Sequence, residues 1–257
     1  ALAKLTPGRR GETCARPRVV AFGGSQGGHA ALWVDRLAPY YAGELELRGT
    51  IATVPPSDIL GQIVPALTSV IDATANTIAM LALAGPWYGL ADRLDEIFVP
   101  PLDGDIPAAL AGSCDPEDAV GTYDTLEEVF QPALLAAAAA GTLADFGEWG
   151  CLLTENGLTT TTIDRLPPTS ESYGILFVLS QLDELVNPAV ERAAFATLCA
   201  RGLRMEYLEC AGADHVDGTY WAIPEIVDFA EARMAGEPFD ASTVCEVQPA
   251  ARCRGTP

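Results

Sequence analysis

Residues 19–28 read VVAFGGSQGG, and the helix-like stretch HAALWV follows at residues 29–34. The apolar run predicts a β-strand, the glycines predict a tight turn, and the last stretch predicts a helix. In this order of elements, a Gly-x-Ser-x-Gly sequence holds its serine exposed at the apex of a sharp turn. Such a turn leaves room only for very small residues two positions before and after the serine, where Gly23 and Gly27 stand. Ser25 is therefore the first candidate for a catalytic nucleophile.

The helix after the turn is expected to point its free N–H groups and positive dipole end at the turn. An anion that forms on a substrate oxygen would be stabilised there, with the Gln26 N–H as one donor. A glycine-rich turn can instead hold a phosphate, but this stretch does not match Gly-x-Gly-x-x-Gly, and no Gly-Lys-Ser/Thr follows it. A turn without any catalytic role is the other alternative.

The chain contains two histidines that could accept the serine proton. A serine hydroxyl is a poor nucleophile near neutral pH unless a base, usually histidine, takes its proton. His29 lies one helical turn beyond Ser25, where its ring cannot easily reach the hydroxyl, so we interpret it as a packed or surface residue. His215 follows the β-type run at 204–208, in the loop after the last predicted strand. The base lies in that loop when the chain order is serine, acid, histidine, so His215 is the predicted base.

A carboxylate that orients the imidazole should precede His215 in the chain. The most strand-like run of the second half covers residues 172–180, and the sequence QLDELVNP follows it directly. Asp183 stands at the end of this strand, with one predicted helix, at about residues 189–201, and one strand between it and His215. This spacing places the two loops side by side on a parallel sheet, so Asp183 is the predicted acid.

Three other carboxylates lie near these positions. Glu184 is the second candidate for the acid, because it occupies the same loop as Asp183. Asp214 and Asp217 are too close in sequence to His215 to approach its far nitrogen comfortably.

These stretches resemble the α/β-hydrolases, and more narrowly the secretory lipase family. The resemblance is carried by GGSQGGHAALW at residues 23–33, LDELVNP at 182–188 and LCARG at 198–202, and it extends from about residue 18 to residue 245. It implies a mostly parallel sheet flanked by helices, with an inserted helical cap. It also implies an ester hydrolase that acts on acylglycerols or other apolar esters, with Ser25, Asp183 and His215 as its triad and no metal ion or organic cofactor.

The chain departs from the resemblance at its N-terminus. An α/β-hydrolase carries several strands and helices before the nucleophile strand, but only a short stretch precedes Ser25 here. We therefore expect the N-terminal part of the sheet, which would also carry the second oxyanion donor, to be absent from this chain. A missing N-terminal segment of the same protein is accordingly an expected partner, and residues 19–22 should lack a neighbouring strand on one side.

The pattern of strands predicts one catalytic domain with an insertion. Residues 1–54 and 169–257 form the catalytic domain, and residues 55–168 form a helical cap, since this segment is far longer than a crossover requires. Residues 58–84 are long and apolar enough to suggest a membrane span. Polar residues and a proline interrupt them, however, and their apolar residues follow a helical period, so we predict one or two buried cap helices. A further helix is predicted at residues 126–140.

Composition limits the classes of partner. The chain has 257 residues, 49% of them hydrophobic, which is enough for a sizeable core in a soluble protein. Its 35 acidic and 15 basic residues give a formal net charge of −20. Such a surface repels phosphate backbones and anionic membranes, so nucleic acid is excluded and stable membrane insertion is not expected. The expected partner is a small-molecule or lipid ester substrate.

The seven cysteines favour a secreted protein with disulfides, because they form no Cys-x-x-Cys or Cys/His metal spacing. The family resemblance implies a C-terminal bridge between Cys199 and Cys245, and a bridge between Cys114 and Cys151 would close the cap. An odd count leaves one thiol free or paired with the missing segment.

The sequence thus predicts a secreted serine carboxylic-ester hydrolase that forms an acyl-enzyme on Ser25. A serine peptidase of the prolyl oligopeptidase type shares the Gly-x-Ser-x-Gly-Gly turn and the order of acid and histidine, although it normally has a β-propeller and no such cap. A non-catalytic binding protein on the same fold is a further alternative, but such proteins commonly lose a triad member.

Overall fold

A computed structural model describes residues 17–113, 115–166, 170–239 and 242–257. The chain divides into two compact units, one formed by residues 1–57 and 162–257 and the other by residues 58–161.

The first unit is built on a parallel sheet, whose strands within the described residues follow the order β1-β2-β3-β4. They are β1 (Arg18–Gly24), β2 (Glu46–Thr53), β3 (Gly174–Ser180) and β4 (Met205–Cys210). The apolar strand β3 is buried along its whole length, as a central strand of a covered parallel sheet should be. The edge strand β1 pairs with β2 alone in this part of the chain, and its Phe22 is 54% exposed. Within the described residues, residues 19–22 therefore lack a neighbouring strand on one side, as the sequence predicts.

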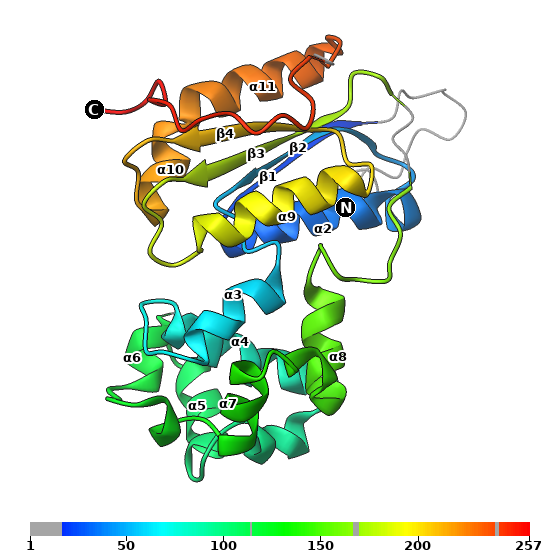
Figure 1. The fold of residues 1–257 in the computed structure, drawn as a ribbon. Coiled ribbons are helices and arrows are strands. Elements are labelled where there is room, and N and C mark those ends of the chain that lie inside the picture. Colours follow the sequence, from blue (N-terminus) through cyan, green and yellow to red (C-terminus); the bar gives the residue numbers. More distant parts are fainter. Residues whose placement is uncertain (1–16, 114, 167–169, 240–241) are drawn as a thin grey trace. The chain divides into compact units, whose positions relative to one another are not determined.

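Helices cover both faces of this sheet (Figure 1). On one face lie α2 (Gln26–Tyr41) and α9 (Pro188–Ala200), and on the other lies α11 (Ile223–Ala235). The short helix α10 (His215–Trp221) packs on β3 and β4. Because all the strands run the same way, the loops that follow β1, β3 and β4 open at one edge of the sheet. This edge holds the residues predicted to be catalytic.

The second unit is helical. It contains α3 (Ile59–Ala66), α4 (Thr74–Trp87), α5 (Leu102–Leu110), α6 (Pro116–Val120), α7 (Pro132–Ala139) and α8 (Gly147–Asn156), with short 3-10 turns at Ala91–Glu96, Leu126–Glu128 and Leu143–Asp145. Its core includes the fully buried Trp149, and the ring of Phe98 stacks on that of Phe130 with centroids 5.8 Å apart. No helix in the described part of the chain is long and apolar enough to cross a membrane.

Of the helices predicted for this unit, one needs a correction. Residues 58–84 form two helices, α3 and α4, within the predicted one or two, and α4 continues to Trp87. Residues 126–140 do not form one helix, because the chain is extended at Gln131 and Pro132 occupies the first turn of α7. Proline is favoured in the first turn of a helix, because N–H groups there have no acceptor within the helix and the missing N–H costs nothing. Phe130, just before this break, forms a bridge with Phe98.

The second unit is shorter than the predicted cap, because it covers residues 58–161 and not 55–168. The segments that flank the second unit belong to the first, because both are attached to α2. The Nδ1 of His29 donates a hydrogen bond to the carbonyl of Pro56 over 3.0 Å. After the second unit, the guanidinium of Arg165 forms a buried ion pair with Asp35, with 2.7 Å between Nη2 and Oδ1. Charges this deeply buried are stable only when paired.

One predicted disulfide is present and the other lies partly outside the described residues. Cys199, near the end of α9, is bonded to Cys245, as the family resemblance implies. Cys151 is exposed and has no disulfide partner among the described residues. Its predicted partner Cys114, like Cys14, is not among the described residues.

Candidate active site

Ser25 stands at a strained turn between β1 and α2. Its backbone has φ 54° and ψ −122°, a conformation that is uncommon for any residue except glycine and that typically occurs at functional sites. The Ser25 N–H donates to the Thr53 carbonyl over 2.8 Å, which attaches the turn to the end of β2. A Cβ at Gly23 would lie 2.0 Å from the Gly27 carbonyl oxygen, so no other residue fits there. The turn therefore has the geometry that the glycine pattern predicts.

The structure brings Ser25, His215 and Asp183 into one chain of hydrogen bonds. The Oγ of Ser25 lies 2.8 Å from Nε2 of His215. On the other side of the ring, Nδ1 lies 2.8 and 2.9 Å from the two carboxylate oxygens of Asp183. An ionised carboxylate has no proton to donate, so Nδ1 carries the ring proton and donates it to Asp183. Nε2 is then the acceptor for the Ser25 hydroxyl.

Asp183 and His215 are both shielded from solvent. The side chains of Asp183 and His215 are only 2% and 8% exposed. The Oδ1 atom of Asp183 also accepts the N–H groups of Leu185 and Val186, over 3.0 and 2.7 Å. These bonds fix the carboxylate where it can orient the ring, because a buried carboxylate is stable when its oxygens are hydrogen-bonded.

The other carboxylates near His215 contact its main chain or its helix. Glu184 accepts the His215 N–H through Oε2 over 3.1 Å, so of the two candidates for the acid it is Asp183 that contacts the ring. The Asp214 side chain caps α10 by accepting the Asp217 N–H over 2.8 Å.

Gln26 is the first residue of α2. Its N–H is one of the first four of the helix, which have no acceptor within the helix and lie at its positive dipole end. This position, directly after Ser25, is the one expected for an oxyanion donor.

His29 takes no part in this chain of hydrogen bonds. Its Nδ1 donates to the Pro56 carbonyl, and its Nε2 accepts the indole N–H of Trp33 over 3.0 Å. Burial lowers the pKa of His29, although the bond to Pro56 opposes this shift. Both ring nitrogens are therefore engaged in the neutral form, and His29 is a packed residue, as interpreted from the sequence.

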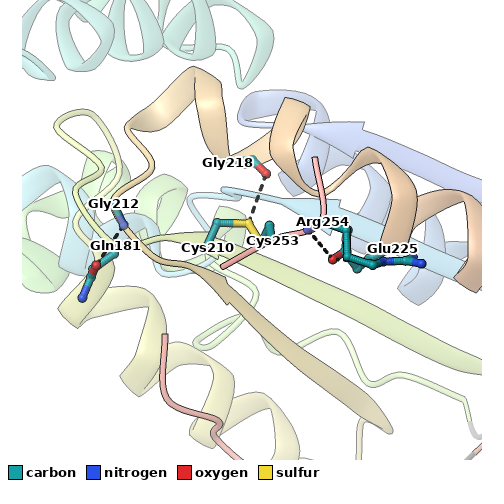
Figure 2. Close-up of a disulfide and its surroundings, with 7 residues drawn as sticks. All are labelled: Gln181, Cys210, Gly212, Gly218, Glu225, Cys253 and Arg254. Carbon is teal, nitrogen blue, oxygen red and sulfur yellow. Dashed lines mark hydrogen bonds and ion pairs between the residues drawn. A yellow bond between two sulfur atoms is a disulfide. The ribbon is translucent and has the colours of Figure 1, made fainter. Parts of the chain in front are cut away.

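A second disulfide, which the sequence analysis missed, holds the loop that carries His215 (Figure 2). Cys210, the last residue of β4, is bonded to Cys253 in the C-terminal tail. In the same loop, the Gly212 N–H donates to Oε1 of Gln181 over 2.9 Å, which connects it to the loop of Asp183. The signal available was a cysteine at the end of the strand before the histidine, but nothing in the tail identifies its partner.

Comparisons with known proteins identify the family and the fold. The family described as secretory lipase matches residues 8–241. No curated protein has a sequence that matches the chain.

Several solved structures share the fold. Candida antarctica lipase A in its closed state has a TM-score of 0.67 at 15% sequence identity, with 94% of this chain and 54% of that chain covered. The rice cell wall degrading esterase LipA from Xanthomonas oryzae has a TM-score of 0.62 at 15% identity, with 85% and 57% covered. A putative hydrolase from Legionella pneumophila has a TM-score of 0.65 at 17% identity, with 87% and 58% covered.

This chain thus spans a little over half the length of these structures, and it shares the α/β fold predicted for it. At such low identity the structures establish the fold alone, whereas the family match covers most of the sequence. The chain belongs to the secretory lipase family.

Proposed function

We propose that this protein is a serine carboxylic-ester hydrolase that cleaves apolar acyl esters through an acyl-enzyme on Ser25. The observation that carries the proposal is the continuous chain of hydrogen bonds from Ser25 through His215 to Asp183. Membership of the secretory lipase family favours esters over peptides as substrates.

In the first half of the reaction, Ser25 Oγ attacks the ester carbonyl while His215 Nε2 takes the hydroxyl proton. The imidazolium that forms is stabilised by Asp183, which stays ionised. The N–H of Gln26 donates to the oxyanion of the tetrahedral intermediate. His215 then gives its proton to the departing alcohol, and the acyl group stays on Ser25.

In the second half, a water molecule attacks the acyl-enzyme, and His215 Nε2 takes a proton from this water. When the second tetrahedral intermediate collapses, the acid product leaves and Ser25 recovers its proton from His215. Each step uses side chains and main-chain groups of the protein itself.

We assign residues 58–161 to the inserted helical cap, because this helical unit follows β2 and precedes β3 in the chain. We also propose that the protein is secreted. Two disulfides support this location, since such bonds persist in oxidising compartments, and so does the name of the family.

Labelling with a fluorophosphonate, combined with two chromogenic substrates, tests the proposal. The protein should hydrolyse p-nitrophenyl esters and leave prolyl-p-nitroanilides intact, and Ser25→Ala should lose both labelling and turnover. Ser69→Ala, which alters an exposed serine of the second unit, is the matched control and should behave like the wild type. Cleavage of the anilide would support a prolyl peptidase instead, and labelling that persists in Ser25→Ala would refute the assignment of the nucleophile.

A further inference from the structure

Two consecutive carboxylates after β3 hold two different parts of the same histidine. Asp183 contacts the ring of His215 at Nδ1. Glu184 contacts its main chain, because Oε2 accepts the His215 N–H over 3.1 Å. The position of an imidazole depends on its backbone as well as on its ring contacts, so the second bond bears directly on the geometry of the site.

The His215 N–H needs an acceptor from outside its own helix. It is the first N–H of α10, and the first four N–H groups of a helix have no acceptor within it. The capping side chain of Asp214 is already used by the Asp217 N–H. Glu184 supplies the acceptor for His215, and its negative charge is favourable at the positive end of a helix.

The bond also completes a series of contacts between the two loops. The main-chain N–H groups of Gln181 and Leu182 donate to the carbonyls of Cys210 and Ala213, over 3.1 and 2.9 Å. These bonds hold the loops in register up to Ala213. The bond from Glu184 extends the series to the catalytic histidine itself.

We propose that Glu184 is a positioning residue for catalysis, which fixes the backbone of His215 so that its Nε2 stays 2.8 Å from Ser25 Oγ. The inference rests on the ester hydrolase function proposed above. Asp183 restrains the ring of His215, and Glu184 restrains the main chain to which its side chain is attached. Displacing a reacting group by about 1 Å costs about 10²-fold in rate, so this restraint contributes to turnover.

The role requires an acceptor oxygen at residue 184, and it does not require a charge. Glu184 is exposed, so solvent screens the effect of its charge on the ring. A glutamine has a side-chain oxygen at the same distance from the backbone and can accept the same N–H. An alanine has none. The pair Glu184→Gln and Glu184→Ala therefore separates the bond from the charge.

The experiment compares the two variants with the wild type and with Asp217→Ala. This control removes a carboxylate from the first turn of the same helix while leaving the Glu184 bond intact. Two quantities are measured: kcat and KM on a p-nitrophenyl ester, and the proton NMR signal of the Nδ1–H that His215 shares with Asp183. The chain has two histidines, so its spectrum contains only two imidazoles and His29 serves as the internal reference.

Glu184→Ala should lower kcat about tenfold, with little change in KM, which corresponds to the loss of one hydrogen bond. Its His215 Nδ1–H signal should broaden or move. Glu184→Gln and Asp217→Ala should stay close to the wild type in both measurements.

Equal loss in the Gln and Ala variants would overturn the proposal, because it would make the charge responsible. So would full activity and an unchanged signal in Glu184→Ala, or an equal loss in Asp217→Ala. A wild-type protein that hydrolyses no ester would instead refute the proposed function, and the NMR signal would still decide whether Glu184 positions His215.

Discussion

Removal of the disulfide between Cys210 and Cys253 should reduce stability and activity by separate routes. The two cysteines are 43 residues apart, and the entropy of closing a loop of this length in the unfolded chain corresponds to about 4 kcal/mol. Cys210 and Cys253 are also 0% and 1% exposed, so replacing both by alanine removes buried packing and adds to this cost.

The disulfide between Cys199 and Cys245 provides a matched control within the same molecule. Its cysteines are 46 residues apart, so the same relation again gives about 4 kcal/mol. It differs in position, because Cys199 lies in α9 whereas Cys210 directly precedes the loop of His215. Both double alanine variants should therefore lose about 4 kcal/mol of stability from the lost loop closure. Cys210→Ala/Cys253→Ala should lose somewhat more, because its cysteines are the more buried pair.

Urea unfolding followed by circular dichroism measures the two losses of stability. Ester hydrolysis is then measured at 15 °C, after circular dichroism has verified that each variant is folded. We expect kcat to fall about tenfold in Cys210→Ala/Cys253→Ala, since a looser loop holds His215 less well. It should stay near the wild-type value in Cys199→Ala/Cys245→Ala. Equal activity in the two folded variants would refute the claim that the Cys210 bridge supports the histidine.

Three further changes test other parts of the structure. Asp183→Asn should lower kcat by about 10⁴-fold, because an amide does not hold the catalytic tautomer of the imidazole; a loss below tenfold in steady-state kinetics would contradict this role. The pKa of His29 is lower in the folded protein than its usual value. Below about pH 6.5 the unfolded chain therefore takes up a proton that the folded chain does not, and the free energy of unfolding should fall as the pH drops. Urea midpoints between pH 7.5 and 5 should therefore decrease more steeply in the wild type than in His29→Gln, and equal slopes would contradict the assignment. Asp35→Ala should destabilise the protein by about 3–5 kcal/mol in the same urea assay because it leaves the charge of Arg165 buried and unpaired, while Asp35→Leu combined with Arg165→Met should cost much less.

The turn at Ser25 could be predicted from sequence because its geometry depends on adjacent residues. A strand, a turn with a positive φ and a helix follow one another within a few positions, and the space beside Ser25 admits only glycine at Gly23. The order of Asp183 and His215 after their strands follows from the parallel arrangement of β3 and β4, which the alternation of strands and helices predicts. The single helix predicted at residues 126–140 is wrong, because Pro132 favours the first turn of a helix and α7 begins there, after an extended Gln131.

The amino-acid sequence by itself determined the local geometry at Ser25 and the chain order of the three residues that meet there. The tertiary structure alone decided that Cys253 pairs with Cys210, and that Glu184 contacts the main chain of His215 while Asp183 contacts its ring. Local backbone sterics act between neighbouring residues and leave a pattern in the sequence. Contacts between distant loops depend on how the whole sheet and the tail close in space, where neighbours in sequence such as Asp183 and Glu184 can point at different atoms of one partner.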